Sequence, residues 1–212
     1  NKGPIASRLE GFDRYHAESA WTWENMALTR ARIVDAPPEL AQKISAILTR
    51  TLTQSRNADA LRNDVADMRA RIAREHDEQS PWDIKYRAGG LIDIEFIAQF
   101  LMLRHAADNA EILAANTFDA LEILRDASFL GANDARVLLE TLRLWQNLQC
   151  VLRLTADNSA RETAMTIGQR NLLLQAGGTR DFDALEAKMN AAANRVRAIF
   201  DATIKTNSKD FS

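Results

Sequence analysis

Apolar residues recur at spacings of three and four along most of the chain, and no stretch alternates with a period of two for long enough to predict a strand. The spacing is strictest between Phe182 and Thr203, where it is typical of the seam between antiparallel helices. The longest predicted helices cover residues 5–34, 39–56, 57–78, 91–106, 134–155 and 181–206. We therefore expect an all-α fold over residues 1–212, a single antiparallel (up-and-down) bundle of about six or seven helices.

The first predicted helix carries apolar residues on two sides. Its main apolar arc includes Trp23 and is interrupted by Arg30, whereas Trp21 and Leu28 lie on the opposite side. A bundle helix needs only one apolar stripe, so the second stripe predicts a second partner. We expect Trp21 and Leu28 to be at least partly exposed, with Arg32 close by on the same side.

The predicted helix that follows Gly89-Gly90 is apolar on nearly every side, yet it contains Asp93, Glu95 and Gln99. Burying a charged group costs several kcal/mol, as an order of magnitude, unless a partner neutralises it. These side chains are therefore expected to meet partners, either elsewhere in this chain or on a neighbouring domain.

Two carboxylates in an Asp-x-Glu pattern after a Gly-Gly pair suggest the metal site of polymerase-type nucleotidyltransferases. On a strand, Asp93 and Glu95 would point to one face and could share Mg²⁺. The local spacing is helical, however, and on a helix positions i and i+2 lie about 200° apart. We therefore expect no shared metal ion here, and the sequence offers no catalytic or metal-binding residue.

Composition narrows the classes of protein further. The chain is 46% hydrophobic and 26% charged, with only 8 Gly and 4 Pro, which is typical of a soluble helical protein. A net charge of −2 gives no argument for a nucleic-acid partner, and no apolar run is long enough for a membrane span. The single Cys150 excludes an internal disulfide, so we expect a cytoplasmic setting and a packed thiol.

Two blocks of residues resemble the helical domains of the glutamine synthetase adenylyltransferase family, whose members both adenylylate and deadenylylate that enzyme. The first block is Lys85 with Gly89-Gly90-Leu91-Ile92-Asp93-Ile94-Glu95-Phe96 and Gln99. The second is Ala20-Trp21-Thr22-Trp23-Glu24 through Ala27-Leu28-Thr29-Arg30-Ala31-Arg32. Because the two blocks occur in the family's order, the resemblance covers most of the chain.

The resemblance implies a larger parent enzyme that uses ATP and Mg²⁺ to transfer AMP to a tyrosine of glutamine synthetase. It implies regulation by the PII signal protein, with glutamine as an effector. The opening Asn1-Lys2-Gly3-Pro4 resembles the end of a nucleotidyltransferase core, so we expect an excised domain from the C-terminal half of the parent. Residues 1–34 would link to that core and pack on it, and the fragment itself would be inactive and carry no cofactor.

Alternatives remain open for the candidate residues. Lys85 is expected to pair with Asp93 or Glu95 across the glycine turn, or both carboxylates meet partners from other helices. The same cluster would serve either an interface with the catalytic core or the bundle's own stability. Arg30 and Arg32 would reach toward the core or pair with acidic neighbours. A stand-alone protein-interaction bundle, unrelated to nucleotidyl transfer, is the alternative function.

Overall fold

The computed structural model describes residues 7–76, 80–155 and 165–205, and these residues form helices and connecting loops without a strand. The all-α prediction is confirmed. The nine α-helices of the described residues are α1 Leu9–Glu18, α2 Thr22–Leu28, α3 Pro38–Leu52, α4 Ala58–Glu75, α5 Leu91–His105, α6 Thr117–Asp126, α7 Ala132–Thr155, α8 Ile167–Gly177 and α9 Phe182–Phe200. A 3₁₀ turn, η1 (Ala110–Ile112), follows α5, and a π-helical turn, η3 (Asp201–Lys205), extends α9.

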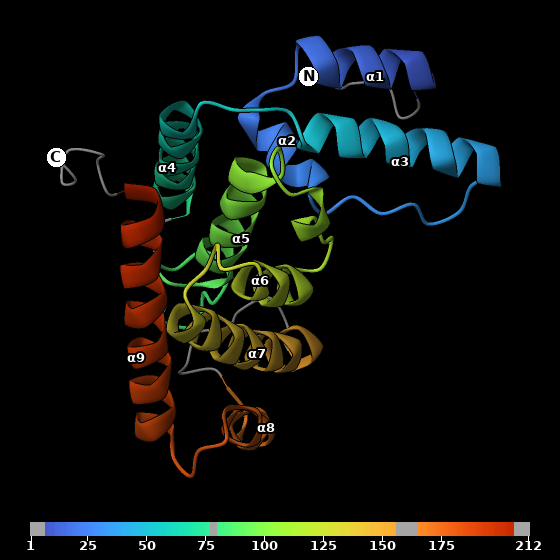
Figure 1. Ribbon diagram of the computed structural model, residues 1–212. Helices are drawn as coiled ribbons and strands as arrows, with labels where there is room; N and C mark the ends of the chain where they lie inside the picture. Colours follow the sequence, from blue (N-terminus) through green and yellow to red (C-terminus); the bar gives the residue numbers. More distant parts are fainter. Residues whose placement is uncertain (1–6, 77–79, 156–164, 206–212) are drawn as a thin grey trace, which may run out of the picture.

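Helix α5 is the centre of the body and contacts α2, α4, α6, α7 and α9 (Figure 1). Twelve of its fifteen residues are buried, which agrees with a sequence that is apolar on nearly every side. Its neighbours are amphipathic and turn their apolar faces toward it; Trp145 of α7 and Phe200 of α9, for example, are fully buried. Any polar group at one of these twelve buried positions must therefore find its partners inside the body.

The prediction of one continuous helix over 5–34 is wrong. The described part of this segment forms α1 and α2, separated by Ser19, Ala20 and Trp21, and the predicted start at residue 5 lies outside the described residues. The side chain of Glu24 explains the break, because its carboxylate accepts hydrogen bonds from the Trp21 backbone N–H at 2.8 Å and the Tyr15 hydroxyl at 2.6 Å. A carboxylate in the first helical turn thus starts a new helix.

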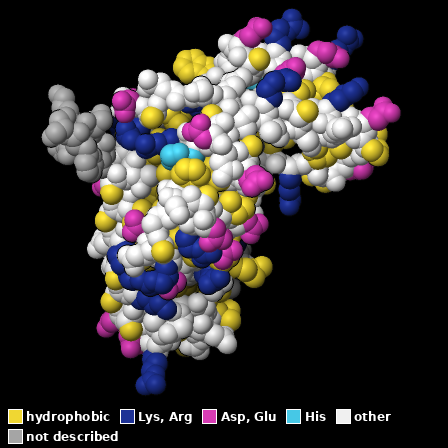
Figure 2. Space-filling model, viewed as in Figure 1, with side chains coloured by type: hydrophobic (Ala, Val, Ile, Leu, Met, Phe, Trp, Pro, Cys, Tyr) yellow, Lys and Arg dark blue, Asp and Glu magenta, His cyan; other side chains and the backbone are white. Residues whose placement is uncertain are grey.

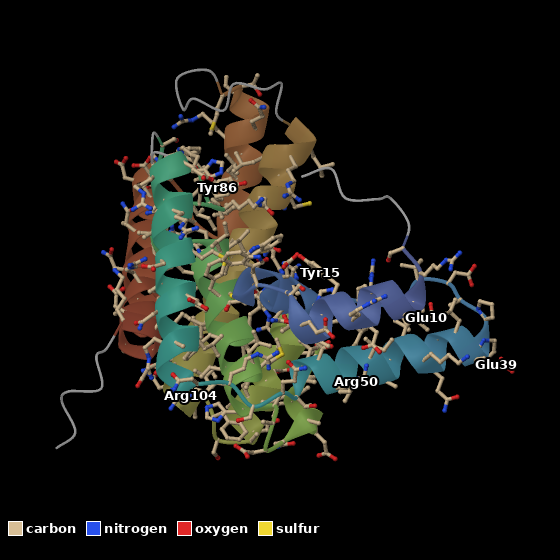
Figure 3. All side chains as sticks on the ribbon, turned by 90° about the horizontal axis from the view of Figure 1, so that it is seen from above. Glu10, Tyr15, Glu39, Arg50, Tyr86 and Arg104 are labelled. Carbon is tan, nitrogen blue, oxygen red and sulfur yellow. The ribbon has the colours of Figure 1, made fainter. Side chains whose placement is uncertain are left out.

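Helices α1 and α3 lie side by side and project from the body (Figure 3). Figure 3 shows Glu10 and Glu39 at the outer end of this pair, with Tyr15 and Arg50 nearer the body. Both helices therefore run inward in the same direction, and the up-and-down order does not extend to them. An ion pair between Asp13 and Arg50 joins the two.

Helix starts follow the capping signals of the sequence. The side chain of Asn57 accepts from the Ala60 N–H at 2.9 Å, and that of Asn116 accepts from the Phe118 N–H at 2.8 Å.

The expectation of a packed thiol at Cys150 is wrong, since this residue of α7 is exposed. Within the described residues, no helix has the length and apolar content that crossing a membrane requires.

A compact turn over residues 80–90 supports the start of α5. The carbonyl oxygens of Ile84 and Lys85 accept from the first two N–H groups of α5, at 3.0 and 3.2 Å. Gly89 has a φ of +74°, and its carbonyl accepts a hydrogen bond of 3.1 Å from the indole of Trp145. A side chain at Gly89 would overlap the backbone of Ala193 in α9, so only glycine fits this close approach.

We predict that Gly89→Ala lowers the free energy of unfolding by about 2–6 kcal/mol, the sum of left-handed strain and overpacking. Urea unfolding followed by far-ultraviolet circular dichroism measures this change. Gly11→Ala is the matched control, because a Cβ at Gly11 meets nothing within 4 Å and Ala favours a helix by about 0.5–1 kcal/mol. Equal stabilities of the two variants would contradict the assigned role of Gly89.

Candidate functional site

Asp93, in the first turn of α5, is fully buried and has partners from three segments of the chain. Its carboxylate accepts from the Gly89 N–H at 2.8 Å, from Arg197 Nη1 of α9 at 3.2 Å, and from Arg69 Nε of α4. Two guanidinium groups, a backbone donor and the positive end of the helix dipole all surround the buried carboxylate. We call Asp93, Arg69, Arg197 and Gly89 the carboxylate hub.

Arg69 connects the hub to the turn before α5. It is almost fully buried, and its Nη2 donates to the carbonyl oxygens of Tyr86 at 2.9 Å and Arg87 at 3.2 Å. The sequence analysis missed this residue. The available signal was the interval of four positions from Leu61 to Val65 and from Val65 to Arg69, which places Arg69 on the buried stripe of α4.

Arg197 extends the hub to the end of α9. Besides Asp93, it pairs with Asp201 at 2.9 Å, and Lys205 pairs with the same Asp201 oxygen at 3.1 Å. The side chains of Asp93, Arg197, Asp201 and Lys205 therefore form a row of alternating negative and positive charges from the centre of the body to η3. Sequence reasoning missed Arg197 as well, although it lies four positions after the core residue Ala193 and therefore on the same side of α9.

Glu95 points away from the hub and pairs with Arg30 at 2.9 Å. Both side chains are partly exposed, Glu95 at 26% and Arg30 at 48%. The pair joins the loop after α2 to α5, and thus connects the two sequence blocks that carried the family resemblance. Asp93 and Glu95 meet different arginines, as their helical spacing predicts.

Lys85 is not the partner expected from the sequence. Its residue is exposed, and its ammonium lies 4.7 Å from the ring centroid of Tyr86. Both carboxylates instead meet arginines from elsewhere in the chain, the alternative that the sequence left open. Gly90 and Gln99 are buried, Gly90 where a Cβ would overlap the Ile84 carbonyl, so both lie within the body.

The N-terminal candidates lie at the surface. Trp21 is 70% exposed and Leu28 is half-buried against the core, which confirms the prediction of partial exposure. Arg32 is exposed in the loop between α2 and α3. Trp23 is 55% exposed, so its expected place in a buried arc is wrong, because that arc assumed one unbroken helix.

Two titratable groups of α1 respond to the junction between α1 and α2. Donation to the Glu24 carboxylate raises the pKa of the exposed Tyr15 hydroxyl above its usual value. Partial burial lowers the pKa of His16, and the nearby negative charge of Glu24 opposes this shift. The Glu24 carboxylate therefore shapes the electrostatics of the junction as well as its backbone.

The carboxylate hub is suited to holding helices together and not to binding a metal ion. Asp93 is saturated by hydrogen-bond donors and Glu95 faces another side of α5, so the pair does not fit Mg²⁺. In the described part of the chain, no three His, Cys, Asp or Glu residues are grouped as a metal ion would require. On the face in Figure 2, Lys and Arg side chains lie among Asp and Glu side chains.

Comparisons with known proteins agree with the sequence blocks. Residues 59–204 match the family model described as GlnD PII-uridylyltransferase, and residues 1–47 match the model described as glutamate-ammonia ligase adenylyltransferase. A relative from Rhodopseudomonas palustris (strain TIE-1) is 43% identical to this chain, over 95% of this chain and 20% of the relative. It is named bifunctional glutamine synthetase adenylyltransferase/adenylyl-removing enzyme. The same name belongs to relatives from Bradyrhizobium diazoefficiens (42%, over 97% of this chain and 21% of the relative) and Xanthobacter autotrophicus (40%, 96% and 21%).

These matches confirm the resemblance to the glutamine synthetase adenylyltransferase family. The chain spans about a fifth of the length of the curated relatives it matches.

We predict that Asp93→Ala and Glu95→Ala differ sharply in stability. Removing Asp93 leaves Arg69 buried without its counter-ion, which costs about 3–5 kcal/mol of unfolding free energy. Removing Glu95 breaks a partly exposed pair worth at most about 1 kcal/mol. Chemical denaturation of both variants measures the difference. A loss of unfolding free energy below about 1 kcal/mol for Asp93→Ala would contradict the stabilising role of the carboxylate hub.

Proposed function

The chain belongs to the family that the GlnD PII-uridylyltransferase model describes, and we propose that it serves as a helical domain of a bifunctional glutamine synthetase adenylyltransferase/adenylyl-removing enzyme. Within that enzyme we place it after the C-terminal nucleotidyltransferase core, in the adenylylating half. The observation that carries this proposal is the 43% identity to a relative of that name over 95% of the chain.

The proposed parent acts in the cytoplasm and transfers AMP from ATP, with Mg²⁺, to a tyrosine of glutamine synthetase. A separate unit of the parent removes the AMP, and the PII protein and glutamine regulate the balance. The substrate follows from the names of the relatives, while the tyrosine, PII and glutamine follow from the resemblance of the sequence blocks.

The role proposed for this domain is non-catalytic: it packs on the catalytic core and contributes to its regulation or docking. The commitment of Asp93 to two arginines supports this, because phosphoryl-group chemistry needs carboxylates free to hold metal ions. The Arg30–Glu95 pair supports it as well, since it holds the segment that follows α2 against the central helix. The exposed Trp21 and Arg32 then supply a surface for the core.

A stand-alone interaction bundle is the second candidate. Composition alone permits it, but a match along 95% of the chain to adenylyltransferases favours the domain of a larger enzyme. The two candidates differ in whether variants of the exposed N-terminal surface alter AMP transfer by the full-length enzyme.

We predict that the 212-residue chain alone transfers no AMP to glutamine synthetase in the presence of ATP and Mg²⁺. The measurement is incorporation of radiolabelled AMP into glutamine synthetase, with the full-length enzyme as positive control and a reaction without enzyme as background. Incorporation above that background by the chain alone would disprove the non-catalytic role.

Titration of the chain with glutamine, and separately with PII, followed by calorimetry, assigns the effector sites. If the heat of binding saturates for one ligand, the site for that effector lies on this domain. If neither ligand gives a heat of binding, both sites lie elsewhere in the parent.

A further inference from the structure

A small notch lies between the start of α2 and the outer face of α4. Its volume is about 180 Å³, and its lining residues are Trp21, Thr22, Trp23, Asp64, Asp67, Met68 and Arg71. Two indole rings on the α2 side and two carboxylates and a thioether on the α4 side thus line a space of side-chain size. One wall belongs to the stretch 1–47 and the other to the stretch 59–204, the two matched by different family models.

The indoles of the notch are unusually exposed for this chain. Trp21 is 70% and Trp23 55% exposed, whereas Trp82 and Trp145 are 4% and 0% exposed. Exposed tryptophans that adjoin each other at a hollow are typical of binding surfaces, because a large rigid ring contributes much contact area at little entropic cost. The notch is therefore a candidate binding surface rather than part of the core.

The charges of the notch favour a cation. Asp64 and Asp67 are both exposed on α4, and the Thr22 hydroxyl donates to Asp64 Oδ2 and so fixes the orientation of that carboxylate. Among the described residues that line the notch, Arg71, one turn beyond Asp67, is the one positive charge against two carboxylates, so this lining carries a net negative charge. An apolar occupant would desolvate the carboxylates without compensation, whereas a cation would pair with them and lie against the indole faces.

We propose that the notch binds an arginine or lysine side chain from the part of the same polypeptide that its relatives carry beyond this segment. This inference rests on the proposed function, because it takes the missing nucleotidyltransferase core as the source of the cation. The relatives support an intramolecular source, since this chain spans only about a fifth of their length. Indole faces and carboxylates together recognise a guanidinium or ammonium group, and α2 and α4 hold both in place.

The test uses the full-length enzyme with the photo-crosslinking residue benzoylphenylalanine in place of Trp23. After irradiation, peptide mapping by mass spectrometry is expected to show a crosslink to one segment outside these 212 residues that contains an arginine or lysine. The matched control carries the same residue in place of Leu154, which is 81% exposed on α7, and is expected not to crosslink to that segment. Crosslinks only to a second copy, only to glutamine synthetase, or only within the 212 residues would overturn the proposal.

A charge swap then tests the chemistry. Asp67→Lys in the crosslinking background is expected to lower the yield at least fivefold, and changing the crosslinked basic residue to Glu is expected to restore it. Asp119→Lys, on the exposed side of α6, is the control and leaves the yield unchanged. A yield that Asp67→Lys does not lower would refute the cation-binding role.

Failure of this inference is distinguishable from failure of the proposed function. If the full-length enzyme adenylylates glutamine synthetase but Trp23 crosslinks elsewhere, only the notch assignment is wrong. If the crosslink forms as expected but no AMP transfer occurs under any condition, the contact stands and the proposed activity is wrong.

Discussion

The body depends on one constraint: the fully buried carboxylate of Asp93 must remain neutralised at the start of the central helix. Three partners meet this requirement from α4, α9 and the turn before α5, so the position of each is set relative to a single pair of oxygen atoms. Arg69 also binds the carbonyl groups of that turn, which prevents the turn from moving independently of α4. Hydrophobic burial supplies most of the driving force for the fold, while the hub joins α4, α9 and the turn before α5 to one carboxylate.

The sequence predicted the elements of the body well because their signals are local. Apolar spacing identified α5 and α9, and the side chains of Asn57 and Asn116 cap helix starts through contacts two or three residues away. The break between α1 and α2 was missed, because it depends on the Glu24 side chain binding Tyr15 nine residues earlier. Apolar periodicity contains no information about such a contact.

At the candidate site, too, the sequence identified the residues with local signals and missed their distant partners. Asp93, Glu95 and the glycine pair were found because charge and glycine stand out within an apolar run. Their partners Arg69, Arg197 and Arg30 lie 24, 104 and 65 positions away, respectively, in segments where arginine is ordinary. Lys85 was a nearby cation in the sequence and the wrong one, since its position at the turn directs it toward Tyr86 and solvent. Proximity along the chain is a poor guide to the partner of a buried charge.

The carboxylate hub also limits how this domain can change during evolution. Arg69 uses Nε for Asp93 and Nη2 for two carbonyl groups, a planar fork of donors that a lysine ammonium cannot reproduce. Arg69 is the buried partner of Asp93, so replacing either of these two residues alone leaves an unpaired charge inside the body, whereas the partly exposed Arg197 can be lost with the Asp93–Arg69 pair still in place. We therefore expect substitutions at Asp93 and Arg69 to arise together, whereas residues of the exposed α2 surface can change singly with whatever they bind. A lineage of such domains would keep its interior charges fixed while its contacts with other proteins drift.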